Sequence, residues 1–106
     1  MPSLFIDTTD NKKIIIALTV NGQEDRVEKH MQGRGSQEAL PLIHELLTKH
    51  NLSPKDLTEI QVNTGPGSFT GVRVGVAIAN ALAFGLGIPV NQTRIENGKT
   101  LVEPTY

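Results

Sequence analysis

The sequence predicts an α/β fold: one mixed sheet of five strands, in the order 3-2-1-4-5, with two main helices. Segments rich in β-branched residues come first and are joined by short turns, which favours antiparallel strands. Two further strand-like segments then alternate with two stretches of helical periodicity, which is typical of parallel strands joined by right-handed crossovers. At 106 residues, the chain has the size of one domain.

The first three strands are predicted from apolar runs and one turn. Ser3–Asp7 is a short apolar strand, and Lys13–Val20 contains consecutive isoleucines, so we expect this second strand to be covered on both faces. Asn21-Gly22 is a strong hairpin signal. The third strand, Gln23–Met31, is mostly charged, so we expect it to form a sheet edge that resists pairing with another chain.

The rest of the chain alternates helix and strand. Ser36 is a plausible N-cap for a helix to Lys49, in which Pro41 either introduces a bend or marks a later start. A short turn at Ser53-Pro54 precedes the fourth strand. The predicted later elements are the fourth strand Leu57–Asn63, the second helix Thr70 to about Leu86, and the fifth strand Ile88–Val90.

Composition excludes several functional classes. The net charge is -1 and the basic residues are scattered, so direct, tight nucleic-acid binding is not expected. The absence of cysteine excludes disulfides, thiolate metal sites and a cysteine nucleophile. MPSLFID shows no signal peptide, and Arg73 and Asn80 interrupt the only long apolar helix. We therefore expect a cytoplasmic protein that does not contact a membrane.

The glycine-rich segment Gly65–Gly71 joins the fourth strand to the second helix, where backbone N–H groups and the helix dipole commonly bind phosphate. It fits neither phosphate fingerprint. The third glycine comes one residue late for a dinucleotide loop, and Val72 stands where a Walker loop needs lysine. The segment either contacts an anion or only permits a sharp turn and caps the helix.

Weak candidates for a phosphate or nucleotide contact surround this segment. Asp7 and Thr8 end the first strand, but such residues also form ordinary turns. Arg73 opposes the helix dipole and needs a partner, most simply a carboxylate such as Asp7, otherwise an anion or another chain. The full set of candidates is Asp7, Thr8, Ser68, Thr70 and Arg73.

No catalytic or metal site is predicted. His44-Glu45 begins like the zinc-protease helix motif, but the next histidine is His50, which lies off the shared helix face. No Ser, His and Asp are spaced as a recognisable nucleophilic arrangement. We therefore expect neither a metal ligand nor a catalytic residue in this chain.

The second helix has a ridge of small residues. Gly71, Gly75, Ala79 and Ala83 recur every fourth residue, and Ala77, Ala81 and Gly85 follow on a neighbouring ridge. Glycine inside a helix is usually explained by close backbone approach, either by the first helix of this domain or by a partner. Because the helix is apolar on more than one face, we predict an intermolecular contact.

Three motifs carry a resemblance to a known family. LFIDTT opens the chain, SQEALPLIHELLTKHNLSPKDLTEIQV follows, and TGPGSFTGVRVGVAIANALAFGLGIPV ends the stretch. Together they resemble the TsaB family, non-catalytic homologues of the glycoprotease family, over about residues 3–91. The resemblance implies an actin-like or ribonuclease-H-like N-terminal domain over residues 1–91. Residues 92–106 would then be a tail, either a last hairpin or partly disordered.

The resemblance also implies a function. It implies a scaffold or activating subunit in bacterial tRNA threonylcarbamoyladenosine (t6A) synthesis, which docks the catalytic subunit TsaD, with the ATPase TsaE joining the assembly. ATP and Mg²⁺ belong to the assembled complex, no cofactor is expected on this chain alone, and tRNA is contacted only indirectly. The same helices could form a homodimer. The implied interface residues are Gly71, Val72, Gly75, Val76, Ala79, Ala83, Ile43 and Leu47.

Two departures from the family pattern bear on this expectation. Such subunits usually continue into a second actin-like half, to which residues 92–106 do not align, and Gly35 stands where a histidine usually precedes Ser36. Without a second half there is no interdomain cleft, so we expect no independent ATP hydrolysis. The alternative function is the phosphate- or nucleotide-binding half of an actin-like ATPase or kinase.

Overall fold

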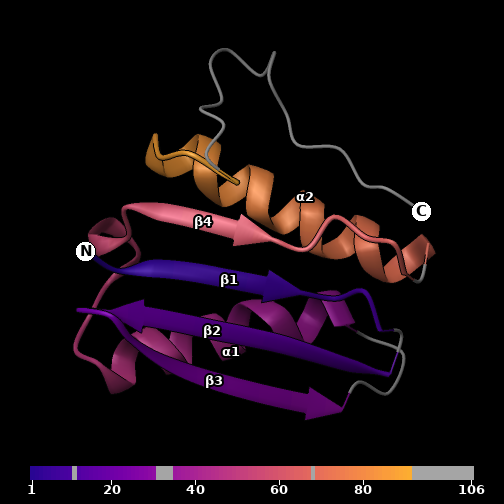
Figure 1. Cartoon of the computed structure of the whole chain (residues 1–106), viewed down its shortest axis with the longest axis horizontal. Helices are drawn as coiled ribbons and strands as arrows, with labels where there is room; N and C mark the ends of the chain where they lie inside the picture. Colours follow the sequence, from indigo (N-terminus) through magenta and orange to yellow (C-terminus); the bar gives the residue numbers. More distant parts are fainter. Residues whose placement is uncertain (11, 31–34, 68, 92–106) are drawn as a thin grey trace.

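The computed structural model describes residues 1–10, 12–30, 35–67 and 69–91 (Figure 1). The predicted tail, residues 92–106, lies outside the described residues. The elements in chain order are β1 (Ser3–Asp7), β2 (Lys13–Val20), β3 (Gln23–His30), α1 (Gly35–Lys49), the short 3₁₀ helix η1 (Pro54–Asp56), β4 (Glu59–Val62) and α2 (Phe69–Leu86).

The described strands form one mixed sheet in the order β3-β2-β1-β4. β2 pairs antiparallel with both β1 and β3, whereas β4 runs parallel to β1. Asn21 and Gly22 join β2 to β3 with φ values of 53° and 79°, as a two-residue hairpin turn requires. The predicted order of the first four strands is therefore confirmed.

The predicted fifth strand is reduced to a single bridge, so a five-stranded sheet is not confirmed. Val90 bridges Ile60 of β4 in parallel, and the next residue, Asn91, has a φ of 48°. The Asn91 side chain makes the hydrogen bonds to Val62 that a neighbouring strand would otherwise make. The Val62 N–H donates to Asn91 Oδ1 at 2.8 Å, and Asn91 Nδ2 donates to the Val62 carbonyl at 3.0 Å. A residue in the left-handed region ends the extended backbone at this point.

Both helices pack on the same face of the sheet. The core contains side chains from alternate positions of the strands, such as Leu4, Ile6 and Ile16, together with residues of both helices. α1 contacts β2, and α2 contacts β4 and β1. In the view of Figure 1, α1 crosses behind β2 and β3. Among the described residues no helix covers the other face, although Ala17 of β2 is buried there and Ile15 is half-buried, so helices cover β2 on one face only.

Local boundaries differ from the predicted ones by a few residues. α1 begins at Gly35 and runs past Pro41, whose side chain is exposed, so a later helix start is excluded. The Ser53 N–H donates to Asp56 Oδ2 at 2.8 Å and starts η1 as predicted, whereas β4 is shorter than predicted. None of the described helices is long and apolar enough to cross a membrane.

Candidate functional site

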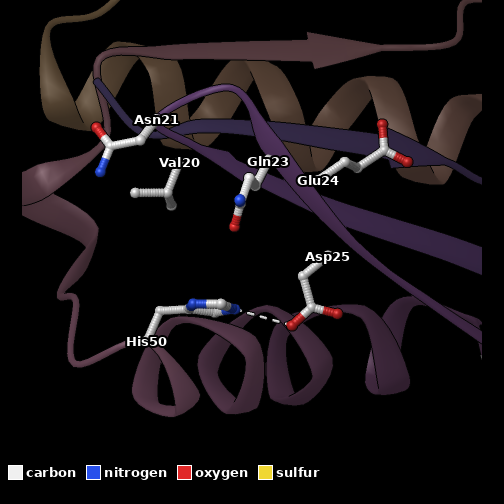
Figure 2. Close-up of a pocket in the computed structure, with 6 residues that line it drawn as sticks. All are labelled: Val20, Asn21, Gln23, Glu24, Asp25 and His50. Carbon is white, nitrogen blue, oxygen red and sulfur yellow. Dashed lines mark hydrogen bonds and ion pairs between the residues drawn. The ribbon is translucent and has the colours of Figure 1, made fainter.

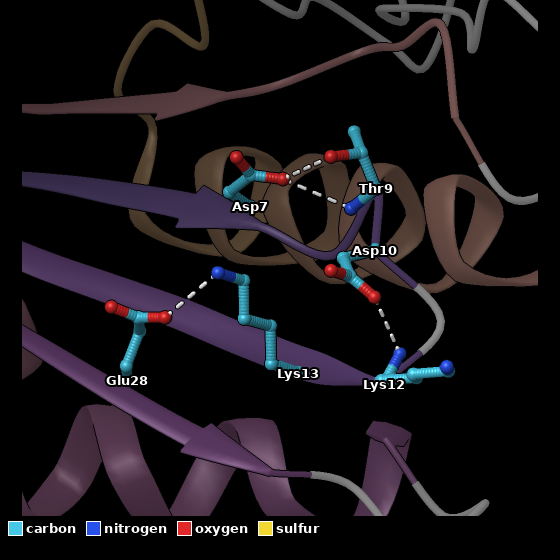
Figure 3. Close-up of polar contacts among 6 residues, drawn as sticks. All are labelled: Asp7, Thr9, Asp10, Lys12, Lys13 and Glu28. Atoms are coloured by element: carbon cyan, nitrogen blue, oxygen red, sulfur yellow. Dashed lines mark hydrogen bonds and ion pairs between the residues drawn. The ribbon is translucent and has the colours of Figure 1, made fainter.

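The turn that follows β1 is built around the carboxylate of Asp7. Asp7 Oδ1 accepts hydrogen bonds from the Thr9 N–H at 2.9 Å and from Thr9 Oγ1 at 2.7 Å (Figure 3). Its other oxygen accepts one from Asn63 Nδ2 at 3.3 Å, which links β1 to the end of β4. These contacts form the turn that short polar side chains favour.

The electrostatics of this carboxylate follow from its contacts. Burial works to raise the pKa of Asp7, but the hydrogen bonds from Thr9 and Asn63 and the positive charge of Arg26 outweigh it. The pKa of Asp7 is therefore below its ordinary value of 3.8. Asp7 is ionised at neutral pH and acts as a hydrogen-bond acceptor that shapes the turn.

Thr8 ties the same turn to α2. It is buried, with 1% of its surface exposed, and its hydroxyl donates to the carbonyl of Gly71 in the first turn of α2. A Cβ atom added at Gly75 would overlap the Thr8 hydroxyl. The glycine at position 75 is therefore needed for close approach of α2 to the end of β1.

The glycine segment packs against this turn. A Cβ atom at Gly67 would lie 2.6 Å from Thr9 Cβ and 2.7 Å from the Thr9 carbonyl oxygen, and Gly65 has a φ of 113°. The sharp-turn interpretation therefore accounts for two glycines of the segment. A phosphate or nucleotide contact is untested and stays a prediction.

The predicted phosphate candidates are only partly brought together. Asp7 and Thr8 lie in one turn beside the glycine segment, and Arg73 is exposed on α2. Ser68 lies outside the described residues, as does the side chain of Thr70. In the part of the chain that the structure describes, no three His, Asp or Glu side chains gather as a metal site.

The small-residue ridge of α2 faces the interior of this chain. The residues predicted to form a partner interface were Gly71, Val72, Gly75, Val76, Ala79, Ala83, Ile43 and Leu47, and all but Gly71 are buried. The partner contact itself is untested, but the seven buried residues are not available as its surface. The physical reason is that α2 lies directly on β1 and β4, so its smallest residues meet its own sheet.

The neighbouring ridge of α2 is the exposed one. Ala77, Ala81 and Gly85 are exposed, and Phe84 beside them has 57% of its surface exposed. We call these four residues the outer face of α2. The repeat of small residues on two ridges was the signal for this surface, but it did not indicate which ridge points outward.

A second polar cluster lies at the opposite end of the sheet and was missed by sequence reasoning. A pocket of about 380 Å³ opens between the β2–β3 turn and the end of α1 (Figure 2). Asp25 and His50 both line it, and Asp25 Oδ2 lies 2.8 Å from His50 Nε2. Outside the pocket lining, Lys49 Nζ lies 2.9 Å from the same oxygen. The hydrogen bonds from His50 and Lys49 hold the pKa of Asp25 below its ordinary value of 3.8. Lys49 and His50 therefore connect the end of α1 to β3.

Comparisons with known proteins agree on one group of relatives. Residues 29–93 match the family model described as TsaD, tRNA N6-adenosine threonylcarbamoyltransferase. The chain is 39% identical over 118 residues to the tRNA threonylcarbamoyladenosine biosynthesis protein TsaB of Bacillus subtilis, which covers 100% of this chain and 50% of that protein. It is 37% identical over 82 residues to TsaB of Haemophilus influenzae, covering 77% of this chain and 35% of that protein.

A solved structure shows the same fold. YeaZ from Pseudomonas aeruginosa matches with a TM-score of 0.79 and 29% identity, over 84% of this chain and 41% of that one. The chain therefore spans half or less of the length of these relatives.

Proposed function

Because the chain belongs to the family of TsaD, the tRNA N6-adenosine threonylcarbamoyltransferase, we propose that it acts in t6A synthesis as a non-catalytic scaffold or activating subunit. The observation that carries this proposal is the similarity to TsaB, which extends over the whole chain. The partner is a TsaD-like catalytic subunit, and a TsaE-like ATPase joins the assembly with ATP and Mg²⁺. The chain contacts tRNA only through these partners.

The outer face of α2 is the docking surface in this proposal. Ala77, Ala81 and Gly85 have little side-chain bulk, so a partner helix can approach the α2 backbone closely. Phe84 adds an exposed aromatic side chain of the kind that anchors protein interfaces. α1 contacts α2 and carries a second exposed apolar side chain, Leu40, which is 52% exposed.

The substitution Ala81→Glu tests this surface. A charged side chain at a desolvated contact should weaken binding to a purified TsaD-like subunit by about tenfold or more. The circular dichroism of the chain should not change, because Ala81 is exposed. Lys55→Gln is the control, since Lys55 is exposed in η1, outside α2, and its replacement lowers the net charge by the same unit. Undiminished binding by Ala81→Glu would exclude this surface.

Reconstitution tests the role itself. The 106-residue chain, added to TsaD-like and TsaE-like subunits, ATP, Mg²⁺ and tRNA, should raise the yield of modified tRNA, and Ala81→Glu should not. A chain that binds the TsaD-like subunit without raising the yield would contradict the activating role while leaving the docking surface intact. A chain that raises the yield equally with either residue at position 81 would contradict the docking surface.

A further inference from the structure

β3 is the free edge of the described sheet. It pairs with β2 along all of its length, and no described strand pairs with its other side (Figure 1). In such an edge strand, alternate residues direct their backbone N–H and C=O groups away from the sheet. α1 contacts β2, one strand in from this edge. The outer backbone groups of β3 are therefore open to another strand.

The charges of β3 are self-complementary about Val27. Arg26 and Glu28 flank Val27, Asp25 and Lys29 come next, and Glu24 and His30 follow. In an antiparallel pair of identical strands with the two Val27 residues opposite each other, each residue faces its counterpart at equal distance on the other side of Val27. Arg26 then faces Glu28, Asp25 faces Lys29 and Glu24 faces His30, so acids lie opposite bases or imidazole at every position.

We propose that β3 is a homodimer interface, in which a second copy of this chain pairs antiparallel across a twofold axis at Val27. The axis is normal to the sheet, so the two four-stranded sheets become one continuous sheet. The contact is isologous, and both helical layers stay on one face. Arg26 and Glu28 pair on the open face, whereas Asp25 and Lys29 pair on the helical face beside Val27.

Other registers are disfavoured by like charges. A register that keeps each side chain on its own face must shift by two residues. One such shift places Arg26 opposite Arg26 and Glu24 opposite Glu28, and the other places Glu28 opposite Glu28. Like charges directly opposite each other are destabilising. The same charges that repel foreign strands therefore permit one register with an identical strand.

The ion pairs within one chain do not fix the charged side chains of β3 in a single rotamer. Arg26 Nε lies 2.8 Å from Glu24 Oε1 of its own strand, and each of the two side chains is 49% exposed. Lys29 lies 3.9 Å from Glu38 of α1, which is long for an ion pair, and its side chain is 53% exposed. Both bonds to Asp25 fall on Oδ2. Pairing with a second copy therefore requires new side-chain rotamers and no change in the backbone.

Charge reversal with rescue tests the proposal. One strand pair is a small interface, so we expect a weak dimer in sedimentation equilibrium of the full chain at low salt. Arg26→Glu and Glu28→Arg should each weaken it by about tenfold or more, because each creates two pairs of like charges. The double variant restores opposite charges and should restore the dimer. Lys55→Glu is the control, since it changes the net charge as Arg26→Glu does, at an exposed residue outside β3.

Two further measurements separate this interface from the outer face of α2. Ala81→Glu should leave the β3 dimer intact, so the outcome is independent of the proposed docking of a TsaD-like subunit. Backbone amides of β3 should exchange more slowly with solvent as protein concentration rises, which gives a readout should a charge variant fail to fold. A wild-type chain that stays monomeric at about 1 mM would overturn the proposal. So would a dimer that Arg26→Glu leaves unchanged, or a double variant without rescue.

Discussion

Gly75 determines how closely α2 approaches the sheet. Its backbone lies against the buried hydroxyl of Thr8, which in turn donates to the carbonyl of Gly71. A glycine inside a helix costs about 1 kcal/mol relative to alanine, and at position 75 the lack of room for a methyl group offsets that cost. Gly85 belongs to the same helix, but a Cβ atom there would have no neighbour within 4 Å. The two glycines therefore provide a matched pair.

We predict opposite effects of the two alanine substitutions. Gly75→Ala should lower the free energy of unfolding by about 1 to 3 kcal/mol, because the added methyl group displaces Thr8 from a packed position. Gly85→Ala should raise it by up to about 1 kcal/mol, because only helix propensity changes. Urea denaturation measures both. Stabilisation by Gly75→Ala would show that α2 has room to move away from β1.

Asp7 should make the stability depend on pH. The pKa of Asp7 is lower in the folded chain than its ordinary value of 3.8. The ionised carboxylate therefore stabilises the fold at pH values above 3.8. That contribution is lost as the pH falls from this value through the folded pKa. Asp7→Asn can still accept the hydrogen bond from the Thr9 N–H, but it does not titrate. The free energy of unfolding should therefore fall less between pH 7 and pH 3 in Asp7→Asn than in the wild type.

At the scale of elements, Asn91 explains why the run Ile88–Val90 adds only one bridge to the four strands of the described sheet. Val90 makes one bridge to β4, and the Asn91 amide then satisfies the N–H and C=O groups of Val62. The strand-like run Ile88–Val90 was visible in the sequence, but the left-handed backbone of Asn91 was not. Asparagine is common both at strand ends and in loops, so its identity alone does not predict this role.

Two substitutions separate the amide of Asn91 from its backbone conformation. Asn91→Gly keeps a backbone that tolerates a φ of 48° but removes both hydrogen bonds to Val62. It should cost about 1 to 2 kcal/mol of unfolding free energy. Asn91→Ala adds left-handed strain and should cost about 1 kcal/mol more. Equal stability of the glycine variant and the wild type in urea denaturation would rule out a contribution from the amide.

At the scale of the whole molecule, local patterns predicted the elements but not which way each one faces. The hairpin at Asn21 and the start of α2 were foreseen to within one residue, because turns and helix starts depend on neighbouring residues. Ser36, which was expected to cap α1, instead lies inside that helix, which begins at Gly35. The orientation of α2 was not foreseen. Val72 and Val76 are buried whereas Val74 and Ile78 are only half-buried, and the apolar character of these four residues does not distinguish them. The contact of Asp25 with His50 joins residues far apart in sequence, and no periodicity indicates it.

The open face of the sheet also had no signal in the sequence. No described helix covers this face, yet Ala17 of β2 has only 1% of its surface exposed. Long side chains lie over it: the guanidinium of Arg26 lies 5.8 Å from the centre of the Phe5 ring, and Lys13 pairs with Glu28 at 2.9 Å (Figure 3). The hydrocarbon stems of such side chains shield apolar surface while their charges stay in water.

Removing this cover should expose apolar surface. Arg26→Ala uncovers Phe5 and Ala17, so we expect stronger fluorescence of the dye ANS and a lower melting temperature than in the wild type. Arg26→Lys keeps a hydrocarbon stem and a positive charge and should show a smaller change. The measurement belongs at low micromolar concentration, where pairing through β3 does not contribute. Lys55→Ala, which removes a cation from an exposed residue of η1, should match the wild type. If Arg26→Ala also matches the wild type, the half-buried Phe5 must be shielded by its strand neighbours alone.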